Sequence, residues 1–239
     1  MPRLLAALIR HGDYEQPAGV PSALLPHPLT PRGVAQAQAL GEALAARERA
    51  GEFVVDATVD TSSLRRAWET GVHVARALEA TLGRPFTVAG FDALVERALG
   101  SMANLTVAEI ERVFADDPRL APLPAGWKAR STFKLPVIGA ESLLEAGARA
   151  ATHIDARLRD LADAPRGDLR GRDTLKLFIS HGAALRHAAH SLGALALDAI
   201  PGLSMYHCRE VLLERAPAGD YSHAGGGWKI RKQAEEHRD

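Results

Sequence analysis

Two histidines of the 239-residue sequence stand just after short apolar runs, and each is followed by glycine. His11 comes one residue after the apolar run 4–9, and His181 follows the segment TLKLFIS. A third stretch, DTSSLRRA, follows the apolar segment FVVDATV and contains Arg65 and Arg66. Neutral imidazole is a competent nucleophile toward phosphorus, and guanidinium donates two parallel hydrogen bonds to phosphate oxygens. Together these residue types indicate a site for a tetrahedral oxyanion such as phosphate.

The three stretches come at the ends of segments that we predict to be strands. Ligands of open α/β sheets bind beyond the carboxyl ends of the strands. If these strands are neighbours, His11, His181, Arg10 and the Arg65/Arg66 pair converge in one pocket. The glycine after each histidine lets the backbone turn sharply and approach a ligand closely.

The rest of the pattern alternates strands with helices. Residues 4–9 lack a polar face, which is typical of a strand buried on both sides. The other predicted strands are FVVDATVDTSS, FTVAG, TLKLFIS, EVLLER and GWKI. The predicted helices are LTPRGVAQAQALGEALAARERAG, LRRAWETGVHVARALEATLG, TVAEIERVFADDP, ESLLEAGARAATHIDARLRDLADA and AALRHAAHSLGAL. This order predicts an α/β protein, a three-layer α/β/α sandwich around a mostly parallel sheet.

Local signals define several element ends. Thr30 as N-cap and Pro31 at the first helical position predict where the first helix starts, and Gly51 its end. Gly83 closes the second helix. We expect one domain over residues 1–239, with a Pro-rich loop or lid insertion around 89–140, and the charged last ten residues are expected to fray.

Composition excludes several classes of protein. Lys plus Arg and Asp plus Glu both number 29, so no net charge favours nucleic acid or an anionic membrane surface. Cys208 is the single cysteine, which excludes an internal disulfide and a cysteine-based metal cluster. The sequence has no apolar run of 18 residues, and the apolar run among its first residues is too short for the core of a signal peptide. We therefore expect a cytoplasmic protein without metal or cofactor.

Four segments in this order resemble a known family: RHG, SSLRRAWET, LVERALGSMANLT and SHGAALR. They are similar to motifs of the histidine phosphatase superfamily, also called the phosphoglycerate mutase-like family, and the resemblance spans residues 4–213. It implies the phosphoglycerate mutase-like fold and a single histidine phosphatase domain.

The resemblance also implies roles for individual residues. His11 is then the nucleophile that becomes phosphohistidine, and Arg10 and Arg66 bind the phosphoryl group. Arg65 stands in the variable position of the motif, so we expect it to be a solvated residue at the helix start, with a second phosphate contact as the alternative. His181 completes the pocket by donating to the phosphoryl oxygens. Glu96, in LVER, is implied as the proton donor to the leaving oxygen and later as the base for water. Nothing in the residues themselves selects Glu96 among the 29 acidic side chains.

Departures from the family pattern favour a phosphatase over a mutase. The segment after the first His-Gly, DYEQPAGVPSALLPHPLTPRG, differs from the mutase segment that helps to seat a sugar phosphate. Ala183 and Ala184 stand where the mutases carry Asn-Ser. We expect a phosphatase acting on a phosphorylated small molecule or a phosphoprotein. The alternatives are a phosphoglycerate-type mutase and a catalytically silent phosphate-binding or phosphoprotein-binding module.

Several residues keep more than one interpretation. Asp13 is the reserve candidate for the general acid, although a loop-capping role suits its position better. His187 and His190 have a spacing seen in metal sites, but no carboxylate or cysteine follows at a matching spacing. Arg186 faces either the pocket or the surface. The Pro-rich 118–140 segment either forms part of a substrate lid or is an irregular loop that its tryptophan, Trp127, holds against the body of the protein. Neither the substrate nor the oligomeric state follows from the sequence.

Overall fold

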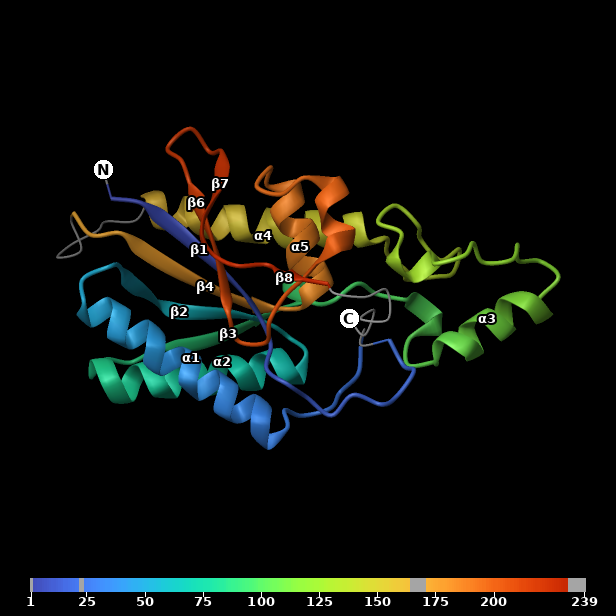
Figure 1. Cartoon of the computed structure of the whole chain (residues 1–239), viewed down its shortest axis with the longest axis horizontal. Coiled ribbons are helices and arrows are strands. Elements are labelled where there is room, and N and C mark those ends of the chain that lie inside the picture. Colours follow the sequence, from blue (N-terminus) through green and yellow to red (C-terminus); the bar gives the residue numbers. More distant parts are fainter. Residues whose placement is uncertain (1, 22–23, 164–170, 232–239) are drawn as a thin grey trace.

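A six-stranded sheet runs through the centre of the computed structural model, which describes residues 2–21, 24–163 and 171–231 (Figure 1). Its strands are β1 (Leu4–Arg10), β2 (Val54–Ser62), β3 (Thr87–Phe91), β4 (Thr174–Ser180), β6 (Glu210–Arg215) and β7 (Tyr221–Gly226). They lie in the order β3-β2-β4-β1-β6-β7. The first four are parallel to one another, whereas β6 pairs antiparallel with β1, and β7 pairs antiparallel with β6. The predicted α/β class with a mostly parallel sheet is confirmed.

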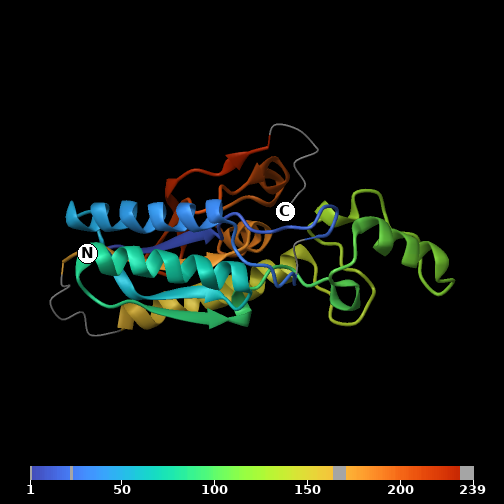
Figure 2. The ribbon, with the colours of Figure 1, turned by 90° about the horizontal axis from the view of Figure 1, so that it is seen from below.

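Helices cover both faces of this sheet, as the two views show (Figures 1 and 2). One face carries α1 (Pro31–Arg49) and α2 (Arg65–Leu82), and the other carries α4 (Leu143–Asp163) and α5 (Gly182–Ser191). The short α3 (Val107–Asp116) lies apart from these layers, in an arm that extends beyond the end of the sheet (Figure 1). Short 3-10 turns are Asp92–Leu94, Gly100–Met102, Trp127–Ala129 and Leu197–Gly202. A separate pair of short strands is β5 (Leu203–Ser204) and β8 (Lys229–Ile230).

The first strand is buried on both faces, as its apolar run predicted. Leu5 and Ile9 pack in the core under α1 and α2, whereas Ala6 and Leu8 pack in the core under α4 and α5. Successive strand residues point to opposite faces, so an unbroken apolar run fills two cores at once. β1 therefore holds a central position in the sheet, beside β4.

The predicted helix signals are mostly confirmed. Thr30 caps α1, since its side chain accepts a hydrogen bond from the N–H of Gly33, and Pro31 is the first helical residue. α1 ends at Arg49, two residues before Gly51. Gly83 closes α2 in the left-handed conformation with φ 69°. The sequence pattern did not reveal β5 and β7, because each lacks the alternating apolar pattern of a half-buried strand.

The arm between β3 and α4 is more ordered than predicted. We expected a Pro-rich loop or lid insertion around 89–140, but the first part of this stretch continues β3 to Phe91 and contains two 3-10 turns. The arm has its own small hydrophobic cluster, formed by Leu99, Ile110, Phe114, Trp127, Leu135 and Ala140. Its tryptophan is 2% exposed, so it pins the Pro-rich 118–140 segment in place. The predicted frayed tail falls mainly on residues 232–239, which lie outside the described part of the chain.

Two further findings concern the single cysteine and the length and apolar character of the helices. Cys208 is a free, buried cysteine, and burial raises the pKa of its thiol to about 12. Across the described residues, no helix combines the length and the apolar character needed to cross a bilayer.

A buried ionic cluster joins β2, β4 and α4 under the second helical layer. Lys176 and Asp60 are fully buried, and their side chains lie 2.7 Å apart. Lys176 also contacts Asp56 at 2.8 Å, beside the irregular pairing of β2 with β4. The other oxygen of Asp60 contacts His153 and Arg157, both at 2.9 Å. Burial would raise the pKa of Asp60, but the hydrogen bond from His153, together with the charge and hydrogen bond of Lys176 and the hydrogen bond from Arg157, outweighs it and lowers that pKa.

Replacing Lys176 tests the contribution of this cluster to stability. We expect Lys176→Met to lower the free energy of unfolding by about 3 kcal/mol, because it leaves a buried carboxylate without its closest cation. The control is Lys134→Met, which removes a half-exposed ion pair with Glu145 and is expected to cost less than about 1 kcal/mol. Denaturant unfolding measures both. Equal losses for the two variants would mean that the buried cluster adds no special stability.

Candidate active site

The carboxyl ends of three adjacent parallel strands bring the candidate residues together. Arg10 at the end of β1 pairs with Ser180 at the end of β4, so His11 and His181 follow at neighbouring strand ends. The N–H of His11 donates to the carbonyl of Ser180 at 2.9 Å. The two imidazole rings lie 5.1 Å apart, centre to centre. The predicted convergence of the two histidines is therefore a direct result of strand order.

Arg66 links the two histidines from the first turn of α2. Its Nε lies 3.2 Å from Nε2 of His11, and one terminal nitrogen lies 3.1 Å from Nδ1 of His181. A further terminal nitrogen donates to the carbonyl of Leu25 at 3.0 Å. The guanidinium is fully buried, yet its two imidazole partners are neutral groups. Such a buried cation is well suited to receive an anion.

The hydrogen-bond partners define which nitrogen of each histidine carries the proton. Nδ1 of His11 lies 2.7 Å from the carbonyl oxygen of Gly12, which can only accept, so Nδ1 carries the hydrogen. Nε2 of His11 then has a lone pair, which accepts from Arg66. In His181, Nδ1 accepts from Arg66, so Nε2 carries the hydrogen and donates to Oγ of Ser62 at 2.9 Å.

Both histidines are held in the neutral form. Burial is the main reason that the pKa of His11 lies well below its usual value, and the charge of Arg66 lowers it further. The same two causes, in the same order, lower the pKa of His181 well below its usual value. Near neutral pH, the site thus offers a neutral imidazole beside a permanent cation.

Of the arginines considered for the pocket, Arg10 and Arg66 lie at the site and Arg65 does not. Arg10 contributes to the charge felt by both histidines, and it donates to the carbonyl of Met205 at 3.2 Å. Arg65 forms an exposed ion pair with Glu69 at 2.7 Å, as expected for a solvated residue at a helix start. Arg66 is the one of the two that turns toward the histidines, since consecutive residues of a helix point in different directions.

Glu96 lies at the N-terminus of α5, next to the histidine that caps this helix. Its Oε1 accepts hydrogen bonds from the N–H groups of Arg97 at 2.9 Å and Ala184 at 3.1 Å. Its Oε2 has one longer contact, 3.4 Å from the N–H of Ala183. Glu96 is 5% exposed, and its charge acts on Arg66. Backbone groups at a helix start thus orient a carboxyl group beside the histidine pair.

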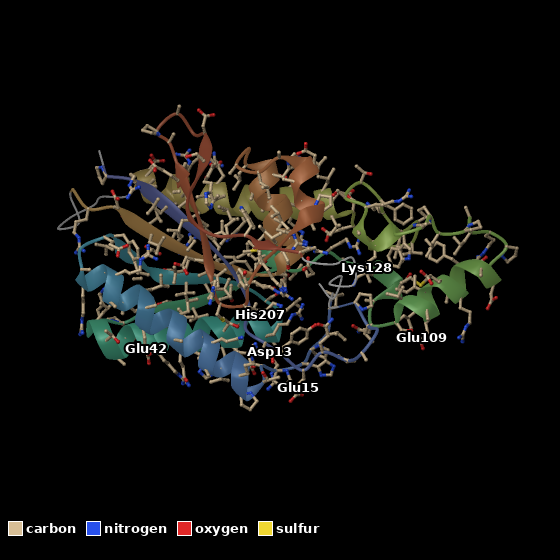
Figure 3. All side chains as sticks on the ribbon, viewed as in Figure 1. Asp13, Glu15, Glu42, Glu109, Lys128 and His207 are labelled. Atoms are coloured by element: carbon tan, nitrogen blue, oxygen red, sulfur yellow. The ribbon has the colours of Figure 1, made fainter. Side chains whose placement is uncertain are left out.

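Asp13 faces α1 instead of the histidine pair. Its Oδ2 accepts from the hydroxyl of Thr30 at 2.7 Å, and its N–H donates to the side chain of Gln36 at 2.8 Å. Figure 3 labels Asp13 near the start of α1. These contacts suit the loop-capping interpretation of Asp13.

The loop after β1 also depends on glycine. A Cβ on Gly12 would lie 2.7 Å from the carbonyl oxygen of Gly33, and one on Gly33 would lie 1.9 Å from that of Asp13. We predicted that glycine follows His11 so that the backbone could approach a ligand. The structure gives another reason, because the backbone at Gly12 packs directly against the start of α1.

Sequence reasoning missed two aromatic neighbours of His11. The Tyr14 ring lies 5.1 Å from the His11 ring, edge to face, and the Arg66 guanidinium lies 4.8 Å from the centre of the Tyr14 ring. Nδ1 of His207, labelled in Figure 3, donates to the backbone carbonyl of His11 at 2.6 Å. Sequence pattern could not place His207 near His11, because the two residues are far apart in the chain. They meet only because β6, the antiparallel strand that follows His207, pairs with β1.

The histidines on α5 are engaged in hydrogen bonds. Nδ1 of His187 donates to the carbonyl of Ala183 at 2.8 Å, and its Nε2 lies 3.0 Å from the hydroxyl of Ser131. Burial lowers the pKa of His187 to about 4. Nδ1 of His190 donates to the carbonyl of Leu195 at 3.0 Å. Within the described ranges, no group of three or more side chains suited to hold a metal ion occurs.

Comparisons with known proteins agree with the observed fold. The sequence matches the family model of the histidine phosphatase superfamily (branch 1) over residues 6–223. No curated protein matches it significantly. A solved structure of mycobacterial glucosyl-3-phosphoglycerate phosphatase with inorganic phosphate is similar, with 25% identity, a TM-score of 0.63, and coverage of 94% of this chain and 96% of that chain.

Two more distant structures share the fold. A putative alpha-ribazole-5'-P phosphatase from Escherichia coli has 21% identity and a TM-score of 0.62, over 94% of this chain and 96% of that chain. A phosphoserine phosphatase from Entamoeba histolytica, in complex with 3-phosphoglyceric acid, has 15% identity and a TM-score of 0.60, over 96% and 98%. Because the family model spans most of the sequence, this chain belongs to the histidine phosphatase superfamily, branch 1.

Proposed function

We propose that this chain is a phosphatase that hydrolyses a phosphomonoester through a phosphohistidine on His11. The orientation of His11 carries the proposal. Its Nδ1–H is held by the carbonyl of Gly12, so the Nε2 lone pair points toward the buried cation Arg66. A neutral imidazole with a fixed tautomer is the form that attacks phosphorus. The lowered pKa of His11 keeps that form abundant near neutral pH.

In the first step, Nε2 of His11 attacks phosphorus, and the bond from phosphorus to the leaving oxygen breaks. Arg66 turns its Nε–H from the imidazole to a phosphoryl oxygen, Arg10 neutralises charge on the other oxygens, and the neutral His181 donates a hydrogen bond to one of them. Glu96 gives a proton to the leaving oxygen. Its Oε2 is the atom suited to carry this proton, because Oε1 already accepts two shorter backbone hydrogen bonds.

In the second step, Glu96 takes a proton from water as the water oxygen attacks phosphorus. The bond between nitrogen and phosphorus breaks, its electron pair returns to Nε2 of His11, and inorganic phosphate leaves. Arg10 and Arg66 supply the positive charge of this scheme, so the proposed reaction is that of a metal-independent, acid-type histidine phosphatase. The names of the similar structures, a glucosyl-3-phosphoglycerate phosphatase and a phosphoserine phosphatase, support a phosphorylated small molecule as substrate.

Removing the proposed nucleophile tests the mechanism. We expect His11→Ala to lower kcat by about 10⁴-fold or more, the order seen when a covalent nucleophile is deleted. The assay is release of inorganic phosphate from 4-nitrophenyl phosphate, followed without added metal. His223→Ala is the matched control, since His223 is exposed on β7 and should retain full activity. Substantial turnover by His11→Ala protein would refute the phosphohistidine route.

The leaving group tests the proton donor. We expect Glu96→Gln to lower kcat/KM by about 100-fold for an alkyl phosphate, the range for loss of a general acid. For 4-nitrophenyl phosphate the loss should stay below about tenfold, because nitrophenolate departs without a proton. Asp13→Asn, which alters the other acid candidate, should lower kcat/KM by the same factor for both substrates. If Asp13→Asn shows the leaving-group dependence and Glu96→Gln does not, the assignment of the acid must be exchanged.

A further inference from the structure

A cavity of about 200 Å³ opens beside the proposed proton donor. Glu96 and Ala183 are among the residues that line it. The cavity therefore borders the carboxyl group that is proposed to protonate the leaving oxygen of the substrate. Arg186, whose orientation the sequence left open, lines this cavity and is 3% exposed. The cavity is therefore placed to hold the group from which the phosphoryl group is removed.

Most of the cavity wall is apolar. Leu99 comes from the arm, Leu143 from the start of α4, and Ile200 from the turn before β5, with prolines at 21 and 201 beside them. A cavity of roughly 150 Å³ with apolar walls accommodates a benzene-sized ligand. About 200 Å³ therefore suits a ring or short branched chain with one further substituent.

Cationic side chains stand around this apolar wall. The cavity is lined by Arg97, Lys128, Arg186 and Arg231, whereas Glu96 is the one acidic residue found among its described lining residues. His187 also lines it, but burial lowers its pKa to about 4, so it is neutral at physiological pH.

These cations come from separate parts of the fold. Lys128 belongs to the arm, between the body of the molecule and α3 (Figure 3), whereas Arg186 lies on α5 and Arg231 follows β8. Arg97 is 6% exposed. Gathering positive charge from three segments around a small apolar space costs desolvation energy, which a bound anion offsets.

We propose that the cavity selects substrates whose leaving group has an apolar body and a second anionic group, a carboxylate or a phosphate, held by Lys128 and Arg186. This inference rests on the proposed phosphatase function, because it assigns the leaving group to the cavity next to Glu96. Arginine and lysine both donate charge-assisted hydrogen bonds to either anion. The substrate is thus doubly anionic, with its two negative groups separated by an apolar spacer.

A matched pair of aryl phosphates tests the proposal. 4-Carboxyphenyl phosphate carries the distal anion, and 4-carbamoylphenyl phosphate replaces it with a neutral group of the same shape. The amide is the better leaving group electronically, so chemistry alone works against the expected preference. We expect kcat/KM to be at least about tenfold higher for the carboxylate, the value of one charge-assisted hydrogen bond. 1,4-Phenylene bisphosphate, compared in the same way, tells whether phosphate is preferred to carboxylate.

Variants connect this preference to the cavity. Lys128→Met should lower the preference for the carboxylate at least threefold and leave kcat/KM for the amide within about twofold. Arg186→Met should bring the preference close to one. Lys134→Met is the control, because Lys134 is a half-exposed lysine of the same arm that pairs with Glu145 and does not line the cavity. It should keep the full preference.

A binding measurement separates this proposal from the proposed function. Calorimetry should detect tighter binding of 4-hydroxybenzoate than of 4-hydroxybenzamide to the wild-type protein, and nearly equal binding of both to Arg186→Met. Equal hydrolysis of the two aryl phosphates, or equal binding of the two phenols, would overturn the anion site while the phosphatase stands. Absence of hydrolysis with selective binding of the benzoate would overturn the phosphatase and support the anion site.

Discussion

The buried guanidinium of Arg66 is the interaction on which the site depends. It contacts both His11 and His181 and has no exposed surface, so each imidazole next to it must stay neutral. A second positive charge at either ring would meet an unscreened cation at hydrogen-bond distance. The lowered pKa values of both histidines follow from this placement together with burial. One buried cation thereby keeps the imidazole of the proposed nucleophile neutral and provides positive charge suited to an anion.

The fold makes this arrangement possible through strand order. Because β2, β4 and β1 are parallel neighbours, their carboxyl ends lie side by side, and each is followed by a residue of the site or by the helix that carries one. The antiparallel β6 returns the chain beside β1, which brings His207 against the backbone of His11. The arm and the segment after α5 then close the space beyond Glu96. The helix and strand layers thus hold the proposed reacting groups, while irregular segments complete the cavity together with residues of α4 and α5.

The sequence predicted the parts that follow from local pattern and strand order. Double burial of β1, capping of α1 by Thr30, and the meeting of His11 with His181 each depend on residues close in sequence or on one sheet rule. Glu96 was reached through family resemblance alone, because its position rests on backbone groups of a helix that starts 86 residues later. The choice of Arg66 over Arg65 also came from the resemblance, since helix start positions do not reveal which of two adjacent side chains turns inward. The cavity cations could not be grouped, because they come from three segments that lie far apart in the sequence.

The central claim is that phosphorus becomes bonded to Nε2 of His11 during turnover. Rapid quenching of the protein with a labelled phosphomonoester, followed by peptide mass spectrometry and ³¹P NMR under alkaline conditions, tests it directly. The account predicts an acid-labile, alkali-stable phosphoryl group on Nε2 of His11 that forms and decays fast enough to lie on the pathway. Phosphate release with no phosphorylated protein, or with the label on another residue, would contradict the account.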